Sequence, residues 1–514
     1  MLKKNILNSL YLIFLGALSA FSLPPYNYFI INFLTFTLFF IFIFNKKKIS
    51  FKNRYFFLYG WFFGFGYFLS GLYWVSISLT FDQTFKFLIP FAIILIPSFL
   101  AIFYGIITYL FAIFYSKKVV VSFLIFSILF GTIELVRGFI FTGFPWNLIA
   151  FSFSENTNFI QILSIIGTYS FNLVCISIFM SPAIFILKKS RSEILACLLF
   201  VVIAVSFLTF GIIRNNQADL LKKNKHNYII RAISPNISLD SFYSNQDELK
   251  IINELISLSN PKDNQPTIFI WPEGIIPDSY LMDMKVYEDL FTKNFSQNHI
   301  IIMGIKNLNN KDNKNLYFNS LAVFDNELNL IQSYDKVNLV PFGEFMPLEN
   351  LFNFFGIGTL TNNHQSFSPG LDRKSLNIES DKFKLSLLPL ICYEIIYSGR
   401  LSGDQEFDYI INISEDGWFG KSIGPKQHFA HSIFRSIESG KYIIRSANNG
   451  VSAIINPLGI VEKKVEFGDV DYIDFTESKV LKATLFAQNG NITFIILILL
   501  YIFLIFSFNR IKNE

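Results

Sequence analysis

Long apolar stretches separated by short polar segments occupy the first ~215 residues, and one more lies near the C-terminus. A helix needs about 20 mostly apolar residues to cross the hydrocarbon core of a bilayer. The pattern therefore predicts membrane spans at residues 6–24, 28–45, 55–79, 87–115, 119–140, 157–187, 194–213 and 491–508. Pro24 and Pro25 predict a tight hairpin between the first two spans. Pro90 and Pro97 predict a kink or a shifted start in the fourth span.

The remaining chain, at residues 216–485, alternates between strand-like and helix-like patterns. Apolar and β-branched runs predict strands at 227–234, 267–270, 299–303, 319–324, 330–334, 383–391, 409–413, 442–446, 452–455 and 459–464. Amphipathic spacing predicts helices at 247–259, 284–294 and 424–440. Such alternation is typical of a layered α/β domain. Residues 348–374 match no helix or strand pattern. We interpret them as a long loop near the functional site of this domain and as a candidate lid.

Composition supports a division into three parts. The chain is 52% hydrophobic and contains 63 Phe residues, most of them in the apolar regions, which is high for a soluble enzyme. We expect a transmembrane domain of about seven spans at 1–215, an α/β domain at 216–485, and a C-terminal transmembrane helix with a cytoplasmic tail at 486–514. No small-residue cleavage site precedes Pro24, so we expect an uncleaved first span rather than a signal peptide.

Positive charge predicts the orientation. Lys46–Lys48, Lys117–Lys118 and Lys188–Arg191 fall on one side of the membrane if the spans alternate, and basic loops are retained in the cytoplasm. The α/β domain is then expected outside the cytoplasm, in the periplasm of a bacterium, which makes this a multi-pass protein of the bacterial inner membrane. These flanking residues account for most of the net charge of +5, which gives no reason to expect a nucleic acid partner.

Chemistry-bearing residues follow three of the predicted strands. Glu273 comes after residues 267–270, Lys336 after 330–334 and Cys392 after 383–391. Taken singly, a loop carboxylate, a surface lysine and a small core cysteine are the ordinary interpretations. Together they are the parts of a thiol acyl-transfer site, because a carboxylate can accept the thiol proton and an ammonium can stabilise an oxyanion. A base and a cation nearby are also expected to lower the pKa of the thiol.

The segments around these residues resemble those of the carbon–nitrogen hydrolase (nitrilase) superfamily. Nearly the whole chain resembles the membrane-embedded branch of that superfamily, the apolipoprotein N-acyltransferases. The motifs of the α/β part are Trp-Pro-Glu at 271–273, Tyr-Phe-Asn-Ser at 317–320, Tyr-Asp-Lys at 334–336, Leu-Val-Pro-Phe-Gly-Glu at 339–344, Cys-Tyr-Glu at 392–394, Asp-Gly-Trp-Phe-Gly at 416–420, Gln-His at 427–428 and Arg-Ser-Ala-Asn-Asn-Gly at 445–450. Those of the membrane part are Phe-Ser-Leu-Pro-Pro at 21–25, Gly-Leu-Tyr-Trp at 71–74 and Thr-Gly-Phe-Pro-Trp at 142–146.

The resemblance implies an α-β-β-α sandwich for the extracytoplasmic domain and a role for each residue of a Glu–Lys–Cys triad. Glu273 would be the general base, Lys336 would stabilise the oxyanion together with backbone N–H groups after Cys392, and Cys392 would be the nucleophile. Residues that match supporting or substrate-binding positions are Glu344, Tyr393, Glu394, Tyr243 and Asn319.

The resemblance further implies an enzyme that transfers a fatty acyl chain from a phospholipid, through a Cys392 thioester, to the α-amino group of an S-diacylglyceryl-cysteine of a lipoprotein. The expected partners are the phospholipid donor, the diacylglyceryl-modified apolipoproteins and membrane lipid. We expect no cofactor, no metal and a monomer. Two alternatives remain open: a membrane-tethered amidase or hydrolase that passes the acyl group to water, and a non-catalytic lipid-binding protein on the same scaffold.

Some positions depart from the family pattern. Phe242–Tyr243 stands where related proteins often have Trp, and Glu415 replaces the usual Asn before Asp416. Val337 and Asn338 replace typically polar or basic residues. These departures affect the expected fit of the substrate, while all three triad residues are retained.

Two further features have alternative interpretations. Arg137 and the loop 142–146 are expected at the non-cytoplasmic end of a span, either as interfacial anchors or close to a lipid head group. His428 and His431 have a spacing that suits metal ligation on a helix, but no third ligand is evident, which favours packing or hydrogen bonding.

Overall fold

The computed structural model describes residues 2–49, 52–81, 83–187, 191–219, 223–239, 248–311, 314–347, 366–399, 401 and 406–510. By its internal packing the chain forms two compact units. The helical unit comprises Met1–Leu220, Phe419–Gly440 and Ala483–Glu514, and the sheet unit comprises Leu221–Trp418 and Lys441–Lys482. Packing is a different criterion from the three expected domains, whose boundaries at 215 and 485 remain predictions.

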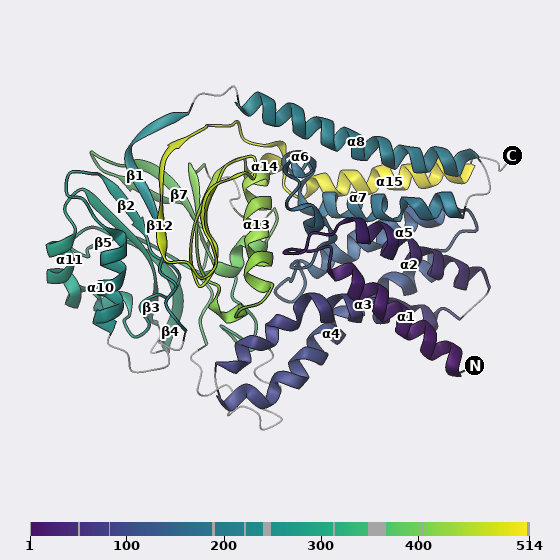
Figure 1. The fold of residues 1–514 in the computed structure, drawn as a ribbon, viewed down its shortest axis with the longest axis horizontal. Helices are drawn as coiled ribbons and strands as arrows, with labels where there is room; N and C mark the ends of the chain where they lie inside the picture. Colours follow the sequence, from purple (N-terminus) through teal and green to yellow (C-terminus); the bar gives the residue numbers. More distant parts are fainter. Residues whose placement is uncertain are drawn as a thin grey trace. The chain divides into compact units, whose positions relative to one another are not determined.

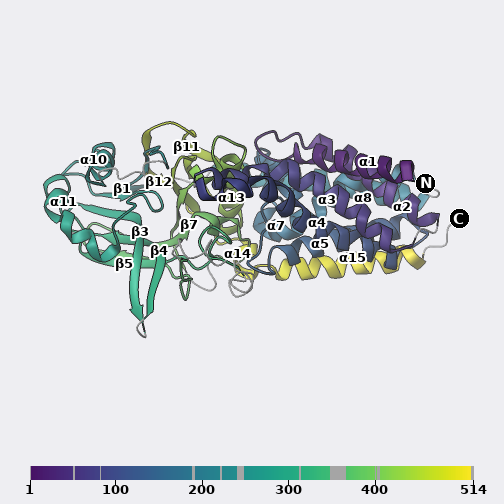
Figure 2. The same ribbon diagram turned by 90° about the horizontal axis from the view of Figure 1, so that it is seen from below.

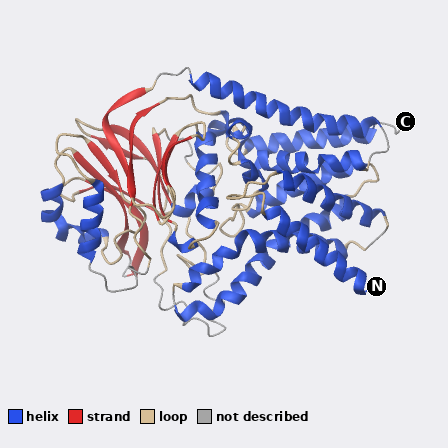
Figure 3. Cartoon of the chain, in the orientation of Figure 1, coloured by secondary structure: helices blue, strands red, loops and turns tan. Residues whose placement is uncertain are grey.

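The helical unit is built from long apolar helices, drawn in blue in Figure 3. Their bounds are α1 (Leu2–Ala20), α2 (Ile30–Lys48), α3 (Arg54–Leu72), α4 (Ile89–Phe114), α5 (Val119–Arg137), α7 (Leu163–Ile186), α8 (Arg191–Asp219) and α15 (Ile492–Arg510). Shorter helices are η1 (Tyr73–Thr80), η2 (Gln83–Leu88), η3 (Ile149–Phe153), α6 (Thr157–Ile160), α13 (Gly424–Ser439) and α14 (Leu485–Asn489).

Seven helical segments in the described part of the chain are long and apolar enough to cross a membrane. They include all the predicted spans except the first, whose apolar helix covers only Ile6–Ala20. The predicted span at 157–187 is interrupted, because α6 ends at Ile160 and Gly167 has non-helical backbone angles inside α7. The fourth span starts at Ile89, with Pro90 in the first helical turn, where a missing N–H costs little.

Glycines bring the backbones of neighbouring helices together. A Cβ atom on Gly60 of α3 would lie 2.1 Å from the carbonyl oxygen of Tyr104 in α4, and one on Gly66 would lie 2.0 Å from that of Ile13 in α1. Close approach through small residues is the usual way for apolar helices to associate in a bilayer. The central helix α7 packs against α2, α5, α8 and α15. The predicted multi-span helical membrane domain is therefore confirmed.

The sheet unit contains two six-stranded mixed sheets, shown in red in Figure 3. The first has the order β12-β1-β2-β3-β4-β5 and the second the order β11-β10-β9-β8-β7-β6. The strands of the first sheet are β1 (Asn224–Ser234), β2 (Thr267–Ile270), β3 (His299–Lys311), β4 (Lys314–Phe324), β5 (Leu330–Asp335) and β12 (Asp471–Ser478). Those of the second are β6 (Leu376–Glu379), β7 (Lys384–Ile391), β8 (Tyr409–Glu415), β9 (Tyr442–Asn448), β10 (Ser452–Ile455) and β11 (Val461–Val465).

Apolar side chains from both sheets form one buried core. Ile230, Ile268 and Ile302 of the first sheet share it with Ile391 and Ile411 of the second. The stretches of β1, β2 and β3, and likewise of β7, β8 and β9, that pair in parallel are buried on both faces, which explains their continuous apolar runs. The two-sheet α/β fold that the pattern and the resemblance predicted is confirmed.

A second core lies on the opposite face of the first sheet. There α10 (Glu248–Ser259) and α11 (Glu288–Asn294) cover the sheet, as Figure 1 shows. The short helix η4 (Leu281–Tyr287) precedes α11, so the predicted helix at 284–294 is two elements. Figure 2 shows β3 and β4 extending as a long hairpin beyond the rest of the sheet. This hairpin exceeds the predicted strands 299–303 and 319–324 because its distal half is polar and gives no apolar signal.

Candidate active site

Three strands of the sheet unit end at the residues that the sequence singles out. Glu273 follows β2, Lys336 follows β5 and Cys392 follows β7. All three side chains are buried. Lys336 is only 1% exposed, which is unusual for a lysine unless it is paired with opposite charge.

Glu273 is held at both carboxylate oxygens. Its Oε1 accepts hydrogen bonds from Asn319 Nδ2 at 2.8 Å and Lys336 Nζ at 3.1 Å. Its Oε2 accepts one from the backbone N–H of Glu415 at 2.9 Å. Donors from the middle of β4 and from the ends of β5 and β8 therefore fix the orientation of this carboxylate.

Glu344 is the second carboxylate beside Lys336. Its Oε1 accepts hydrogen bonds from Lys336 Nζ at 2.9 Å and from Asn319 Nδ2 at 2.7 Å. Its Oε2 accepts the backbone N–H of Val340 at 2.8 Å. Asn319 thus bridges the two glutamates with a single amide group. Glu344 and Asn319, two of the five predicted supporting residues, therefore lie beside Glu273 and Lys336.

The two carboxylates determine the charge of Lys336. Burial alone lowers the pKa of a lysine, but the negative charges of Glu273 and Glu344 outweigh burial and raise the pKa of Lys336 well above its ordinary value. The ammonium is therefore a permanent cation across the physiological pH range. A fixed buried cation is suited to stabilise negative charge that develops in a transition state.

Cys392 has a strained backbone at the turn that follows β7. Its φ angle is +47°, in the left-handed region that residues with a Cβ rarely occupy. The strand ends at Ile391 and a short 3₁₀ helix (η6, Cys392–Ile396) begins at once. A conformation of this kind costs about 1–3 kcal/mol and is found preferentially at functional sites.

The thiol of Cys392 is predominantly protonated in the resting protein. Burial raises the pKa of Cys392 well above its ordinary value, the charges of Glu273 and Asp416 raise it further, and Lys336 opposes them. The expectation that neighbouring charges lower this pKa is therefore wrong, because burial and negative charge outweigh the single ammonium. A neutral thiol needs a base to take its proton as it attacks, and Glu273 is a carboxylate of the same cluster.

Glu394 joins the turn after Cys392 to the segment that carries Lys336. Its Oε2 accepts the N–H of Ile391 at 2.9 Å. Its Oε1 accepts the hydroxyl of Tyr334 at 2.7 Å, the N–H of Val337 at 3.0 Å and Arg373 Nη2 at 2.8 Å. Although burial by itself raises the pKa of Glu394, Arg373 and these hydrogen bonds hold it below its usual range. Glu394 is therefore a charged structural link between two strand ends of the site.

Arg373 was missed by the sequence reasoning. It lies in the segment 348–374, where no periodicity marks any residue. The described end of this segment packs on the site: the N–H of Phe367 donates to the carbonyl of Glu344 and that of Gly370 to the carbonyl of Lys336. Residues 348–365 of the candidate lid lie outside the described part of the chain.

Of the two remaining predicted residues, Tyr393 is described by the structure and Tyr243 is not. Tyr393 is buried, and its ring packs edge-on against that of Tyr397 at 5.6 Å between centroids.

A fully buried ion pair supports the neighbouring strand end. Arg445 Nη2 donates to Oδ2 of Asp416 at 2.7 Å, and Asp416 Oδ1 accepts the hydroxyl of Ser414 at 2.7 Å. Arg445 also donates to Asn412 and to the carbonyl of Val451. Cys392 Sγ and a carboxylate oxygen of Asp416 lie within 4.8 Å of one another. The motifs at 416–420 and 445–450 therefore supply an internal support for the strand ends around Cys392.

Two motifs of the membrane part, at 71–74 and 142–146, meet the Gln-His motif at 427–428 inside the helical unit. Gln427 Oε1 accepts hydrogen bonds from the indole N–H of Trp146 at 2.9 Å and of Trp74 at 3.1 Å. The rings of His428 and His431 each lie 5.3 Å from that of Trp146. Both imidazole rings therefore pack against the indole of Trp146.

Arg137 is 1% exposed and lies inside the helical unit rather than at its surface. Its guanidinium pairs with Glu134 of the same helix and donates to the carbonyl of Phe144. A buried ionic pair of this kind fixes the loop 142–146 from within, so interfacial anchoring does not describe Arg137.

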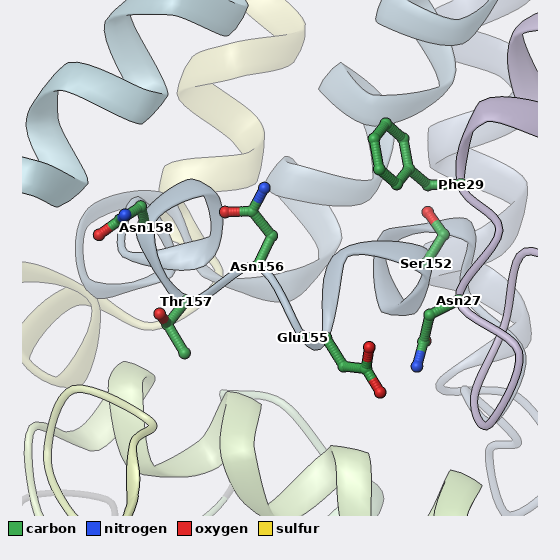
Figure 4. A pocket seen from close by; sticks show the side chains of 7 residues that line it. All are labelled: Asn27, Phe29, Ser152, Glu155, Asn156, Thr157 and Asn158. Carbon is green, nitrogen blue, oxygen red and sulfur yellow. The ribbon is translucent and has the colours of Figure 1, made fainter.

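The helical unit also has a polar hollow of about 340 Å³, shown in Figure 4. It is lined by Asn27, Phe29, Ser152, Glu155, Asn156, Thr157 and Asn158. None of these is a predicted site residue, and the described residues of the lining include no lysine or arginine.

Two family descriptions match the chain. Residues 15–181 match the apolipoprotein N-acyltransferase N-terminal domain, and residues 244–468 match the carbon–nitrogen hydrolase domain. The first match lies in the helical unit, and the second covers most of the sheet unit together with Phe419–Gly440 of the helical unit.

Relatives extend the similarity over most of the chain. An apolipoprotein N-acyltransferase of Rhizobium leguminosarum is 32% identical over 485 residues, which is 91% of this chain and 89% of that protein. One of Rickettsia prowazekii is 33% identical over 467 residues, 87% of this chain and 90% of that protein. Among solved structures, Saccharomyces cerevisiae Nit3, of the nitrilase superfamily, has a TM-score of 0.35 and 14% identity over 50% of this chain and 90% of that one.

Similarity of this extent in both parts of the chain leaves one assignment. The apolar helices make it a membrane protein, and the domain with Glu273, Lys336 and Cys392 is of the carbon–nitrogen hydrolase type. The chain belongs to the apolipoprotein N-acyltransferase family, the acyltransferases of the carbon–nitrogen hydrolase superfamily.

Proposed function

We propose that this protein transfers a fatty acyl chain from a phospholipid to the α-amino group of the S-diacylglyceryl-cysteine at the N-terminus of a lipoprotein. The observation that carries the proposal is the buried ion pair between Lys336 Nζ and Glu273 Oε1, 3.1 Å apart, in one cluster with the strained Cys392. Family membership over about 90% of the chain supports the same reaction.

In the first half-reaction, Cys392 Sγ attacks the carbonyl carbon of a phospholipid ester as Glu273 accepts the thiol proton. Lys336 and the backbone N–H groups after Cys392 stabilise the tetrahedral oxyanion. The C–O bond then breaks, and the lysophospholipid alkoxide leaves with the proton that Glu273 returns. An acyl thioester on Cys392 remains, so one difficult transfer is divided into two steps.

In the second half-reaction, the α-amino group attacks the thioester carbonyl. Glu273 takes a proton from the attacking amine, the C–S bond breaks and the thiol of Cys392 is restored with that proton. Glu344 and Asn319 orient Glu273 and Lys336 in both steps through the hydrogen bonds described above. No cofactor enters this sequence of bond changes.

We place the protein in the bacterial inner membrane as a monomer, with the site on the periplasmic side. Basic segments that fall on one side of alternating spans support this orientation. A site at a membrane surface lets both lipid substrates arrive without leaving the bilayer. The number of apolar helices exceeds what an anchor needs, which fits a role of the helical unit in receiving lipid.

The test is intact-protein mass spectrometry after incubation with phosphatidylethanolamine, with Cys392→Ala as the control. We expect one acyl adduct that maps to Cys392 and that disappears when a diacylglyceryl lipopeptide is added, with formation of the N-acyl product. An adduct that water alone discharges as fast as the lipopeptide does would show that the protein is a hydrolase. A folded protein without an adduct, whose Cys392→Ala variant binds the lipid equally well, would show a lipid-binding protein.

A further inference from the structure

Glu415 is buried at the end of β8, and its backbone reaches the proposed general base. The side chain is 5% exposed. Its N–H is the donor that holds Oε2 of Glu273, at 2.9 Å. Asn319 and Lys336 hold only Oε1, so the peptide N–H of Glu415 sets the rotation of the Glu273 carboxylate about its long axis.

The side chain of Glu415 folds back over its own peptide. Its Oε1 accepts the N–H of Gly417 at 2.8 Å. This contact needs glycine, because a Cβ on Gly417 would lie 2.7 Å from Oε1 of Glu415. The carboxyl therefore fixes the turn that follows its own residue, directly after the last hydrogen-bonded position of the strand.

Two asparagines at the end of the neighbouring strand β9 hold the other side of the carboxyl. Asn448 Nδ2 donates to Oε2 of Glu415 at 2.6 Å, and Asn449 Nδ2 donates to Oε1 at 3.1 Å. The amide of Asn448 cannot rotate away, because its Oδ1 accepts the N–H of Ile237 at 2.8 Å and its Nδ2 also donates to the carbonyl of Ile237. One carboxyl thus joins the ends of β8 and β9 to the segment that follows β1.

We propose that Glu415 is a positioning residue of the active site, whose side chain fixes the peptide N–H that orients Glu273 toward Cys392. This inference rests on the role proposed above for Glu273 as the general base. Without the carboxyl, Gly417, Asn448 and Asn449 lose their common acceptor and the peptide of Glu415 is free to tilt. A tilt moves the N–H away from Oε2, and the proton acceptor for the thiol is no longer held in place.

The test compares Glu415→Ala with Asn456→Ala. Asn456 holds the turn between β10 and β11 through its own side chain, which accepts the N–H groups of Leu458 and Ile460. Both variants lose buried side-chain hydrogen bonds, but only Glu415 is linked to Glu273. The readout is the rate at which iodoacetamide alkylates Cys392 at pH 7, followed by mass spectrometry of the peptide that contains it. Thermal unfolding of each variant identifies the temperature range in which it is folded.

We expect Glu415→Ala to slow alkylation of Cys392 by about 10- to 100-fold, the loss typical of a displaced catalytic group. Asn456→Ala should stay within about two-fold of the wild type, and Glu415→Gln, which keeps one acceptor oxygen, should fall between. In a protein that already carries Glu273→Gln, Glu415→Ala should slow alkylation of Cys392 by less than about a further three-fold. The effects of two residues that act as one unit are not additive.

The proposal is overturned if Glu415→Ala leaves the alkylation rate unchanged, or if Asn456→Ala slows alkylation equally. It is also overturned if Glu415→Ala slows alkylation to the same extent in the Glu273→Gln variant as in the wild type. Alkylation needs no acyl donor. An absence of Cys392 acylation by phospholipid would therefore refute the acyl-transfer function and leave this test intact. An unchanged alkylation rate would refute the positioning role of Glu415 and leave acyl transfer untouched.

Discussion

Lys336 and Glu344, eight residues apart in the chain, form a partly buried ion pair of 2.9 Å between Nζ and Oε1. The same Nζ lies 3.1 Å from Oε1 of Glu273, so one ammonium is shared by two carboxylates. The site therefore carries an excess of negative charge around a single cation. Loss of that cation should therefore have a large effect on the reaction.

Lys336→Met is expected to reduce the rate of Cys392 acylation by at least about 10²- to 10³-fold, the loss measured when an oxyanion donor is removed. The two carboxylates would also lose their shared cation. Single-turnover acylation by phosphatidylethanolamine measures the effect. Lys464→Met is the control, since Lys464 is half exposed and pairs with the surface residue Glu466. Acylation at the wild-type rate in Lys336→Met would remove Lys336 from the mechanism.

Arg373→Ala should lower the free energy of unfolding by about 3 kcal/mol, because it leaves the carboxylate of Glu394 buried without its cation. The pKa of Glu394 is depressed in the folded protein. Its ionised carboxylate therefore contributes to stability above the unfolded pKa of about 4.3, and this contribution is lost as the pH falls through the lower pKa of the folded state. The difference between wild type and variant should therefore shrink below about pH 4.

Denaturant unfolding of the purified protein at pH 7 and at about pH 3 checks this prediction. Lys374→Ala is the matched control, because the adjacent lysine is 71% exposed. Equal losses of stability for Arg373→Ala and Lys374→Ala would show that the Glu394 pair contributes nothing.

Glu415 should make the wild-type protein less stable as the pH rises. Burial, as the main cause, raises the pKa of Glu415 to about 8 in the folded protein, although hydrogen bonds from Asn448, Asn449 and Gly417 oppose the shift. In the unfolded chain the pKa is about 4.3. Between these values the folded state binds the extra proton, so stability is greatest at the acid end and falls by up to about 1.4 kcal/mol per pH unit.

Glu415→Gln removes the titration and should abolish this part of the pH dependence. Unfolding temperatures of both proteins from pH 5 to pH 9 measure it, and the wild type should lose stability relative to the variant as the pH increases. Parallel curves would mean that Glu415 does not change its protonation state in this range.

Gln427→Leu should destabilise the helical unit by about 1–3 kcal/mol, since it removes the acceptor that Trp74 and Trp146 share. The emission of these buried indoles should also change as their N–H groups lose a partner. Thermal unfolding followed by tryptophan fluorescence gives both readouts. The exposed Asn489 on α14, changed to Ala, should leave both unaltered. An identical spectrum and unfolding temperature for Gln427→Leu would contradict the shared hydrogen bond.

The local sequence pattern was sufficient to predict the strands that are buried on both faces. β2 has the predicted bounds, and β8 and β9 were found from continuous apolar runs that only a central parallel strand requires. The strands that were missed, β6 and β12, are both at the edge of a sheet and alternate buried with exposed residues. Their short, polar sequences carry too little apolar signal to differ from a loop.

The candidate site divides in the same way. Sequence alone placed Glu273, Lys336 and Cys392 at strand ends, because the chemical types and the preceding apolar runs are local properties of the chain. Arg373, and the link from Ile237 through Asn448 to Glu415, depend on segments far apart in the sequence that only the packed sheets bring within hydrogen-bonding distance. The raised pKa of the Cys392 thiol likewise follows from burial, which no linear pattern specifies. The sequence determined which chemical groups the site contains, while tertiary packing decided how they are charged and held, since burial and non-local hydrogen bonds exist only in the folded chain.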